Sequence, residues 1–124
     1  MTRLTIRIDF DDERHVGHGK IRLIEMIAQH GSISGAARAM GMSYRRAWLL
    51  LDEVNRMFRE SVVETQLGGK GGGNARLTEF GKGLVELYRN IEVDAGKTFA
   101  RKIAQLEERL AAHQGEPDQR AAPR

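Results

Sequence analysis

The stretch that most constrains the fold is residues 32–48, where a turn separates two short potential helices. The first is rich in alanine and ends at Gly41, which can adopt the left-handed conformation that terminates a helix. Ser43 can then accept hydrogen bonds from the first amides of the second helix, which begins with Arg45 and Arg46 in its first turn. This layout predicts a helix-turn-helix whose second helix presents two guanidinium groups where a recognition helix meets DNA.

Length and composition fit a small intracellular domain. A chain of 124 residues, 40% of them hydrophobic, can form one domain with a short appendage. It has no cysteine, which excludes disulfides and thiolate metal sites and suits the reducing cytoplasm. The apolar stretches are too short to cross a bilayer, and the N-terminus lacks the features of a signal peptide. We therefore expect a cytoplasmic protein with no membrane partner.

The net charge of +3 is unevenly distributed along the chain. Residues 14–76 contain ten basic and five acidic side chains, whereas residues 1–13 carry a net charge of −2 and residues 77–124 are balanced. Positive charge therefore gathers in the region of the helix pair, as in proteins that bind phosphate. A solvated basic surface is the alternative interpretation.

Hydrophobic periodicity predicts the elements around this pair. Apolar and polar residues alternate over 4–10, which predicts a half-buried strand. Helical spacing predicts a first helix over 20–30 that ends at Gly31, and a short second helix over 33–40. The recognition helix, counted from its cap, spans 43–59.

The recognition helix has an apolar face and a polar face. Its core stripe, spaced 4, 3 and 4 residues apart, is Ala47, Leu51, Val54 and Phe58. Arg45 projects from the opposite side, which suits contact with bases, and Arg46 is more lateral, which suits phosphate. Tyr44 lies at the margin, where a phosphate contact and packing against the preceding helix are both open. Trp48 also lies at the margin, and for it a structural role is favoured.

A hairpin is predicted directly after the recognition helix. Residues 62–67 and 75–78 suit two short strands, and the loop between them, 68–74, contains five glycines. Such a hairpin is the wing of a winged helix. Lys70, Asn74 and the backbone of Gly71 and Gly72 can approach phosphates beside the minor groove, although a merely flexible loop is the alternative. A nucleotide-binding P-loop is disfavoured, because glycine rather than Ser or Thr follows Lys70.

The C-terminal part predicts a long helix, capped by Thr78, that carries more apolar surface than a small domain can cover. The apolar spacing loses its phase around Ala95 and Gly96, which predicts a weak point or bend. We divide the chain into a DNA-binding domain (1–78), a dimerisation helix (79–113) and a disordered tail (114–124). The predicted homodimer interface consists of Leu84, Leu87, Ile91, Phe99, Ile103 and Leu106.

The sequence offers little for catalysis. The four histidines form no ligand spacing with acidic residues on one helical face. We expect no enzyme activity, no cofactor and no metal site.

Several of these motifs together resemble one known family over residues 4–91, the N-terminal domain of the molybdate-responsive ModE-type repressors. The residues that carry the resemblance are Gly31-Ser32-Ile33-Ser34, Ala36-Ala37, Gly41, Ser43-Tyr44, Ala47-Trp48, Gly68-Gly69-Lys70-Gly71-Gly72-Gly73, Leu77-Thr78 and Gly81. The resemblance implies a winged helix related to the LysR-type DNA-binding domain, dimerisation through a long helix, and palindromic operators. The family's full-length members also carry C-terminal molybdate-binding domains, and this chain stops before them. We therefore expect DNA binding without molybdate sensing.

The sequence thus predicts a mainly α winged helix-turn-helix with a small β-wing, an N-terminal strand and a long C-terminal dimerisation helix. Its predicted function is sequence-specific transcriptional regulation on double-stranded DNA. The alternative is a winged-helix protein-interaction module or co-regulator without an operator of its own. The predicted DNA-contacting residues are Ser32, Ser34, Ser43, Tyr44, Arg45, Arg46, Lys70, Gly71, Gly72 and Asn74.

Overall fold

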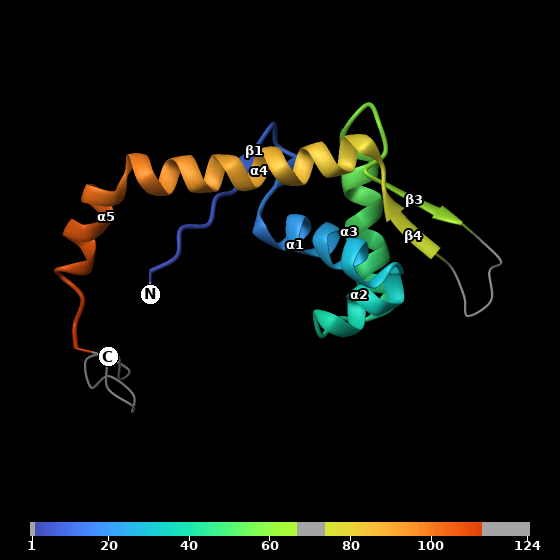
Figure 1. Ribbon diagram of the computed structural model, residues 1–124, viewed down its shortest axis with the longest axis horizontal. Coiled ribbons are helices and arrows are strands. Elements are labelled where there is room, and N and C mark those ends of the chain that lie inside the picture. Colours follow the sequence, from blue (N-terminus) through green and yellow to red (C-terminus); the bar gives the residue numbers. More distant parts are fainter. Residues whose placement is uncertain (1, 67–73, 113–124) are drawn as a thin grey trace.

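The computed structural model describes residues 2–66 and 74–112. Within these ranges, three helices form a body that α4 crosses and extends beyond (Figure 1). The hairpin β3–β4 lies at the opposite end of the molecule from α5 (Figure 1). This arrangement confirms the predicted fold class, a mainly α winged helix with a small β-wing.

The N-terminal strand is shorter than predicted. Only β1 (Ile8–Asp9) pairs, antiparallel to β2 (His15–Val16), a strand that the sequence did not indicate. Between them the Asp11 carboxylate accepts hydrogen bonds from the backbone N–H groups of Glu13 and Arg14, at 3.0 and 2.7 Å. It also pairs with the Arg14 guanidinium, and these interactions hold the pKa of this exposed carboxyl at about 2. The turn between β1 and β2 is therefore stabilised by its own side chains, chiefly that of Asp11.

The three helices of the body match the predicted ones to within two residues at each end. They are α1 (His18–His30), α2 (Ile33–Ala39) and α3 (Tyr44–Met57). Gly31 and Gly41 adopt left-handed conformations, with φ of 72° and 67°. Ser32 Oγ accepts a hydrogen bond from the N–H of Gly35, and Ser43 Oγ accepts one from that of Arg46, both at 3.0 Å.

The core lies where these helices meet. The predicted stripe on α3 is confirmed for Ala47, Leu51 and Val54, which are buried, while Phe58 is partly buried. α1 contributes four side chains to this core that are inaccessible to solvent, those of Ile21, Leu23, Ile24 and Ile27. Ala36 and Ala37 of α2 are also buried, and their small side chains let α2 pack closely on its neighbours.

The wing consists of β3 (Val63–Gln66) and β4 (Asn74–Leu77), paired from Val63–Leu77 to Gln66–Asn74. Asn55 of α3 fixes its base, because its Oδ1 accepts a 2.8 Å hydrogen bond from the N–H of Val62. The N–H of Ala75 donates to the Gly31 carbonyl at 2.9 Å, which joins β4 to the end of α1. Lys70, Gly71 and Gly72 lie outside the described residues.

The long C-terminal helix is interrupted. The predicted single element over 79–113 is divided into α4 (Glu79–Thr98) and α5 (Ala100–Glu107). The break is at Phe99, whose φ of −105° and ψ of 13° are not helical, rather than at Ala95 and Gly96. The predicted tail, 114–124, lies outside the described residues. None of the described helices is long and apolar enough to cross a membrane.

α4 is held on the body by one buried tyrosine and a cluster of charges. Tyr88 is 2% exposed and its hydroxyl donates to the Ile6 carbonyl. Arg89 makes two hydrogen bonds to the Glu25 carboxylate of α1, at 2.7 and 3.0 Å, and one to Glu92 at 2.6 Å. The hydrogen bonds from the Arg89 guanidinium lower the pKa of Glu25, and the pair joins α4 to α1.

Candidate nucleic-acid interface

The exposed face of α3 combines unpaired arginines with large aromatic side chains. Arg45 and Arg46 are exposed in the first turn, and neither forms an ion pair with a described residue. Arg56, further along the helix, is paired with Asp52 at 2.9 Å. Tyr44 and Trp48 are 55% and 45% exposed. The two unpaired cations lie beside the helix N-terminus, which also favours negative charge.

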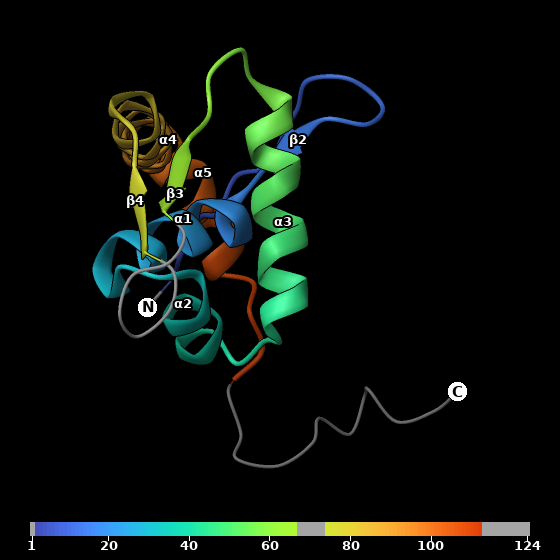
Figure 2. The same cartoon turned by 90° about the vertical axis from the view of Figure 1, so that its right-hand side faces the viewer.

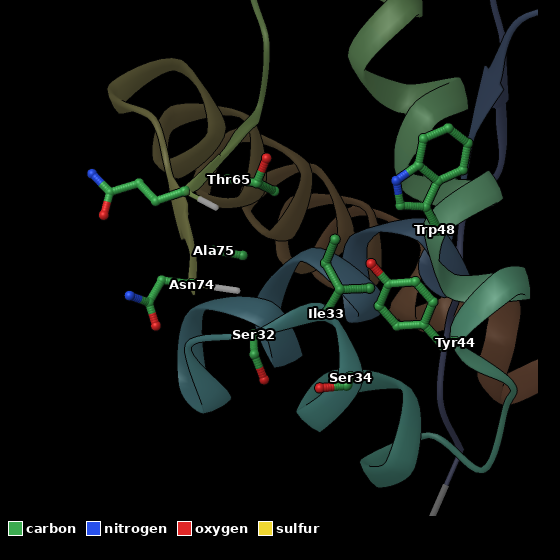
Figure 3. A pocket seen from close by; sticks show the side chains of 9 residues that line it. Ser32, Ile33, Ser34, Tyr44, Trp48, Thr65, Asn74 and Ala75 are labelled. Carbon is green, nitrogen blue, oxygen red and sulfur yellow. The ribbon is translucent and has the colours of Figure 1, made fainter. Parts of the chain in front are cut away.

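A hollow of about 150 Å³ separates α3 from the wing. Figure 2 looks along α4 and shows α3 on one side, β3 and β4 on the other, and α2 below them. In Figure 3, Tyr44 and Trp48 line the α3 side of the hollow, facing Thr65 and Asn74 of the wing. The remaining lining residues are Ser32, Ile33, Ser34, Gln66 and Ala75. The described lining thus contains several hydrogen-bond donors and no charged side chain.

The predicted DNA-contacting residues that the structure describes form two groups, one around the hollow and one beside it at the N-terminal end of α3. Ser32, Ser34, Tyr44 and Asn74 surround the hollow. Arg45 lies beside it, in a shallow depression shared with Tyr44 and Trp48. Ser43 caps α3 at its exposed end, and Arg46 lies in the same turn.

The sequence did not assign three residues of this surface. Thr65 and Gln66 lie on the exposed end of β3, and only the strand itself was predicted there. For Trp48 the sequence favoured a structural role, but its large exposed fraction does not fit a side chain that serves mainly in packing. The sequence signal that could have assigned Trp48 to this surface was the unusual position of a tryptophan at the edge of a core stripe.

A second surface is apolar. α4, the β1–β2 hairpin and the end of α3 enclose a groove of about 490 Å³. Its lining includes Phe10, Phe58, Leu84, Leu87 and Ile91. Of the predicted dimer residues, Leu87, Ile91, Phe99 and Leu106 are exposed, and Leu84 and Ile103 are partly buried.

In the part of the chain that the structure describes, histidine and acidic side chains do not assemble into a metal site. Within residues 2–66 and 74–112, no three His, Cys, Asp or Glu residues are grouped so that they could hold an ion. The His18 ring instead lies among Arg3 and Arg89, with the Arg89 Nη1–Nδ1 distance 3.2 Å. Burial and then these two cations lower the pKa of His18.

These elements define a winged helix-turn-helix domain, and comparison with solved structures agrees. The chain superposes on the CbnR_DBD–DNA complex with a TM-score of 0.55 and 19% identity, covering 71% of this chain and 95% of that one. It superposes on the full-length LysR-type regulator LysG of Corynebacterium glutamicum with a TM-score of 0.52 and 21% identity, covering 72% and 29%. At these identities the likeness establishes the fold.

The curated relatives confirm the resemblance to ModE-type proteins. The chain is 50% identical over 77 residues to the molybdenum-pterin-binding protein MopA of Rhodobacter capsulatus, covering 62% of this chain and 29% of MopA. It is 33% identical over 111 residues to the molybdenum transport protein ModE of Azotobacter vinelandii, covering 88% and 40%. It is 45% identical over 69 residues to the DNA-binding transcriptional dual regulator ModE of Escherichia coli (strain K12), covering 56% and 26%. No protein-family model matches the chain.

The chain spans between 26% and 40% of the length of these three relatives. The similarity therefore concerns one part of each relative, the N-terminal region.

Proposed function

We propose that this chain is a sequence-specific DNA-binding transcriptional regulator. The observation that carries the proposal is the pair of exposed, unpaired arginines in the first turn of α3, Arg45 and Arg46, beside a hollow lined by neutral donors. A helix N-terminus with free guanidinium groups matches the chemistry of phosphate and of guanine edges. The ModE relative from Escherichia coli is itself described as a DNA-binding regulator.

In the proposed complex α3 enters the major groove. Arg45, opposite the core stripe, contacts base edges, and Arg46 and the turn at Ser43 contact phosphates. The wing lies along the adjacent backbone and minor groove, where Lys70 and the glycines of its tip approach the DNA. This assignment of Lys70, Gly71 and Gly72 rests on the sequence alone.

We further propose that the protein binds as a homodimer to a palindromic operator. The apolar groove beside α4 and the exposed stripe of Leu87 and Ile91 support this, because a monomer would leave both in water. A two-fold dimer presents two recognition helices, and a palindrome presents two equivalent half-sites.

The proposed function is binding rather than catalysis, at the chromosome and thus in the cytoplasm of a bacterial cell. We propose that DNA binding by these 124 residues is independent of molybdate, so millimolar molybdate should leave their DNA affinity unchanged. A protein-interaction module without an operator is the second candidate, supported by the same apolar groove.

Selection from a pool of random duplexes, followed by a salt titration of the selected site, tests the proposal. A DNA-binding regulator should enrich a symmetric motif, and its affinity should fall linearly with the logarithm of salt concentration. A shuffled duplex of the same composition is the control and should bind more weakly. Failure to enrich any motif, with no binding to the random pool itself, would favour the interaction module.

A further inference from the structure

We propose that Trp48 donates its indole N–H to a DNA backbone phosphate held in the hollow between α3 and the wing. The inference rests on the proposed function and deepens it, because it assigns a ligand group to a cavity and a role to a residue outside the predicted contact set. The site takes one phosphodiester group and is built from neutral donors.

The first argument is the position of the two aromatic side chains. Trp48 is 45% exposed and lies one turn after Tyr44, which is 55% exposed. Their polar atoms, the Trp48 Nε1 and the Tyr44 hydroxyl, have no hydrogen-bond partner among the described residues. In Figure 3 the Trp48 ring turns its nitrogen toward the wing, across the hollow. A side chain kept only for packing would instead bury its ring.

The second argument is the chemistry of the lining. Ser34, Tyr44, Trp48, Thr65 and Asn74 all carry an N–H or O–H donor, and they come from four different elements around the hollow. No carboxylate lines it among the described residues, so an anion there meets no formal negative charge. A phosphodiester offers two charged oxygens that accept hydrogen bonds, which matches this set.

The third argument is the geometry of B-DNA. The major groove is about 12 Å wide and the minor groove about 6 Å, and one sugar–phosphate strand separates neighbouring grooves. When a recognition helix occupies the major groove and a wing the adjacent minor groove, that strand must pass between them. The hollow bounded by α3 and β3–β4 is the matching space on this protein.

Trp48 therefore differs in role from Arg45. Arg45 projects opposite the core stripe and contacts base edges in the proposed complex. Trp48 is turned sideways toward the wing and contacts the DNA backbone. A phosphate contact carries no sequence information but fixes the register of the helix in the groove. Trp48 is accordingly a positioning contact for the DNA.

The test compares Trp48→Phe and Tyr44→Phe with the wild type on the selected operator and on its shuffled control. Trp48→Phe removes the N–H and keeps an aromatic ring. Losing one hydrogen bond to a charged phosphate oxygen should weaken binding about 12- to 150-fold per bound subunit, equally on both duplexes. The salt slope should stay unchanged, because a neutral donor displaces no counterion. Arg46→Ala is the matched control, and it should lower the slope by about 0.9 per subunit.

A second measurement changes the DNA and compares the wild type with Trp48→Phe. Methylphosphonate, which lacks one charged oxygen, replaces each phosphate of a half-site in turn. One position should weaken the wild type more than it weakens Trp48→Phe, because the two changes remove the same contact. Trp48 is also the only tryptophan of the chain, so it accounts for all tryptophan fluorescence. Acrylamide should quench this fluorescence less when the protein is bound to either duplex than when it is free.

The outcomes separate the two proposals. If selection enriches no motif and the wild type does not bind the random pool, the proposed function fails. If it binds but Trp48→Phe has the same affinity, or loses affinity only on the operator, the phosphate assignment for Trp48 is overturned while DNA binding stands. The absence of any methylphosphonate position coupled to Trp48 would overturn it as well.

Discussion

Gly81, in the first turn of α4, lies directly against the backbone of Val62. A Cβ on Gly81 would be 2.1 Å from the Val62 carbonyl oxygen and 3.2 Å from its Cα. That carbonyl also accepts a 3.0 Å hydrogen bond from the N–H of Thr78, whose own Oγ1 caps α4 through Gly81. This contact joins the start of α4 to the base of the wing. The proposed dimer surface on α4 and the proposed DNA surface are therefore connected through it.

Gly81→Ala should therefore destabilise the fold. The added methyl group collides with backbone, which cannot rotate away, and overpacking of this kind costs about 1–3 kcal/mol. Gly96→Ala, in the same helix, is the control, because a Cβ there has no neighbour within 4 Å. The control should stabilise the protein by up to about 1 kcal/mol through helix propensity. Urea unfolding measures both, and a Gly81→Ala protein as stable as the wild type would show that the contact relaxes freely.

The stability of the fold should also depend on pH through His18. Burial, then Arg3 and Arg89, lower its pKa from 6.5 in the folded state, partly offset by Glu92 and Glu25. The unfolded chain therefore binds the proton more readily, and the free energy of unfolding should fall as pH drops below about 6.5. The pKa of Glu25, lowered chiefly by its hydrogen bonds to Arg89, acts in the same direction nearer pH 4.5.

The variant His18→Gln isolates the histidine contribution. Its free energy of unfolding should change less than that of the wild type between pH 8 and pH 5.5, while the fall toward pH 4 remains. Denaturant midpoints at a series of pH values provide the measurement. An identical pH profile for the two proteins would mean that other groups account for the acid sensitivity.

Local chemistry explains why much of the fold could be predicted. Gly31 and Gly41 end helices and Ser32 and Ser43 begin them, and each acts through neighbours within four residues. The wing could be predicted for the same reason, from two short strands around glycines.

The parts that were missed depend on contacts between distant segments. The hydroxyl of the buried Tyr88 donates to the carbonyl of Ile6, 82 residues away, and no local pattern encodes that pairing. The strand β2 exists only through its partner β1. Trp48 was judged from its place at the edge of a core stripe, and only the packing of α3 beside the wing shows that it borders a hollow.

Dimerisation should depend on the apolar groove. Leu87 is 62% exposed and lines the groove. The variant Leu87→Glu should be a monomer, because its carboxylate would have to lose its hydration in the interface. Val93→Glu is the matched control, since Val93 is 53% exposed on the same helix but does not line the groove. The double change of Ile103 and Leu106 to Glu tests the contribution of α5. Sedimentation velocity at micromolar concentration distinguishes the species, and a monomeric wild type would refute the proposed dimer.

Sequence discrimination should depend on Arg45. Its side chain is exposed and does not belong to the hydrophobic core, so Arg45→Ala should fold as the wild type does. A bidentate contact between arginine and guanine is worth about 1–3 kcal/mol, which corresponds to a loss of roughly 5- to 150-fold in operator affinity per half-site. Affinity for the shuffled duplex should fall far less.

Arg46→Ala removes the same charge from the neighbouring residue and serves as the control for Arg45→Ala. Because Arg46 is assigned to phosphate, its loss should weaken both duplexes by similar factors and leave their ratio unchanged. Titration of each duplex at one fixed salt concentration gives the two ratios. If Arg45→Ala also leaves the ratio unchanged, Arg45 contacts the backbone, and the bases are read by another side chain on the exposed face of α3, where Leu49 is 44% exposed.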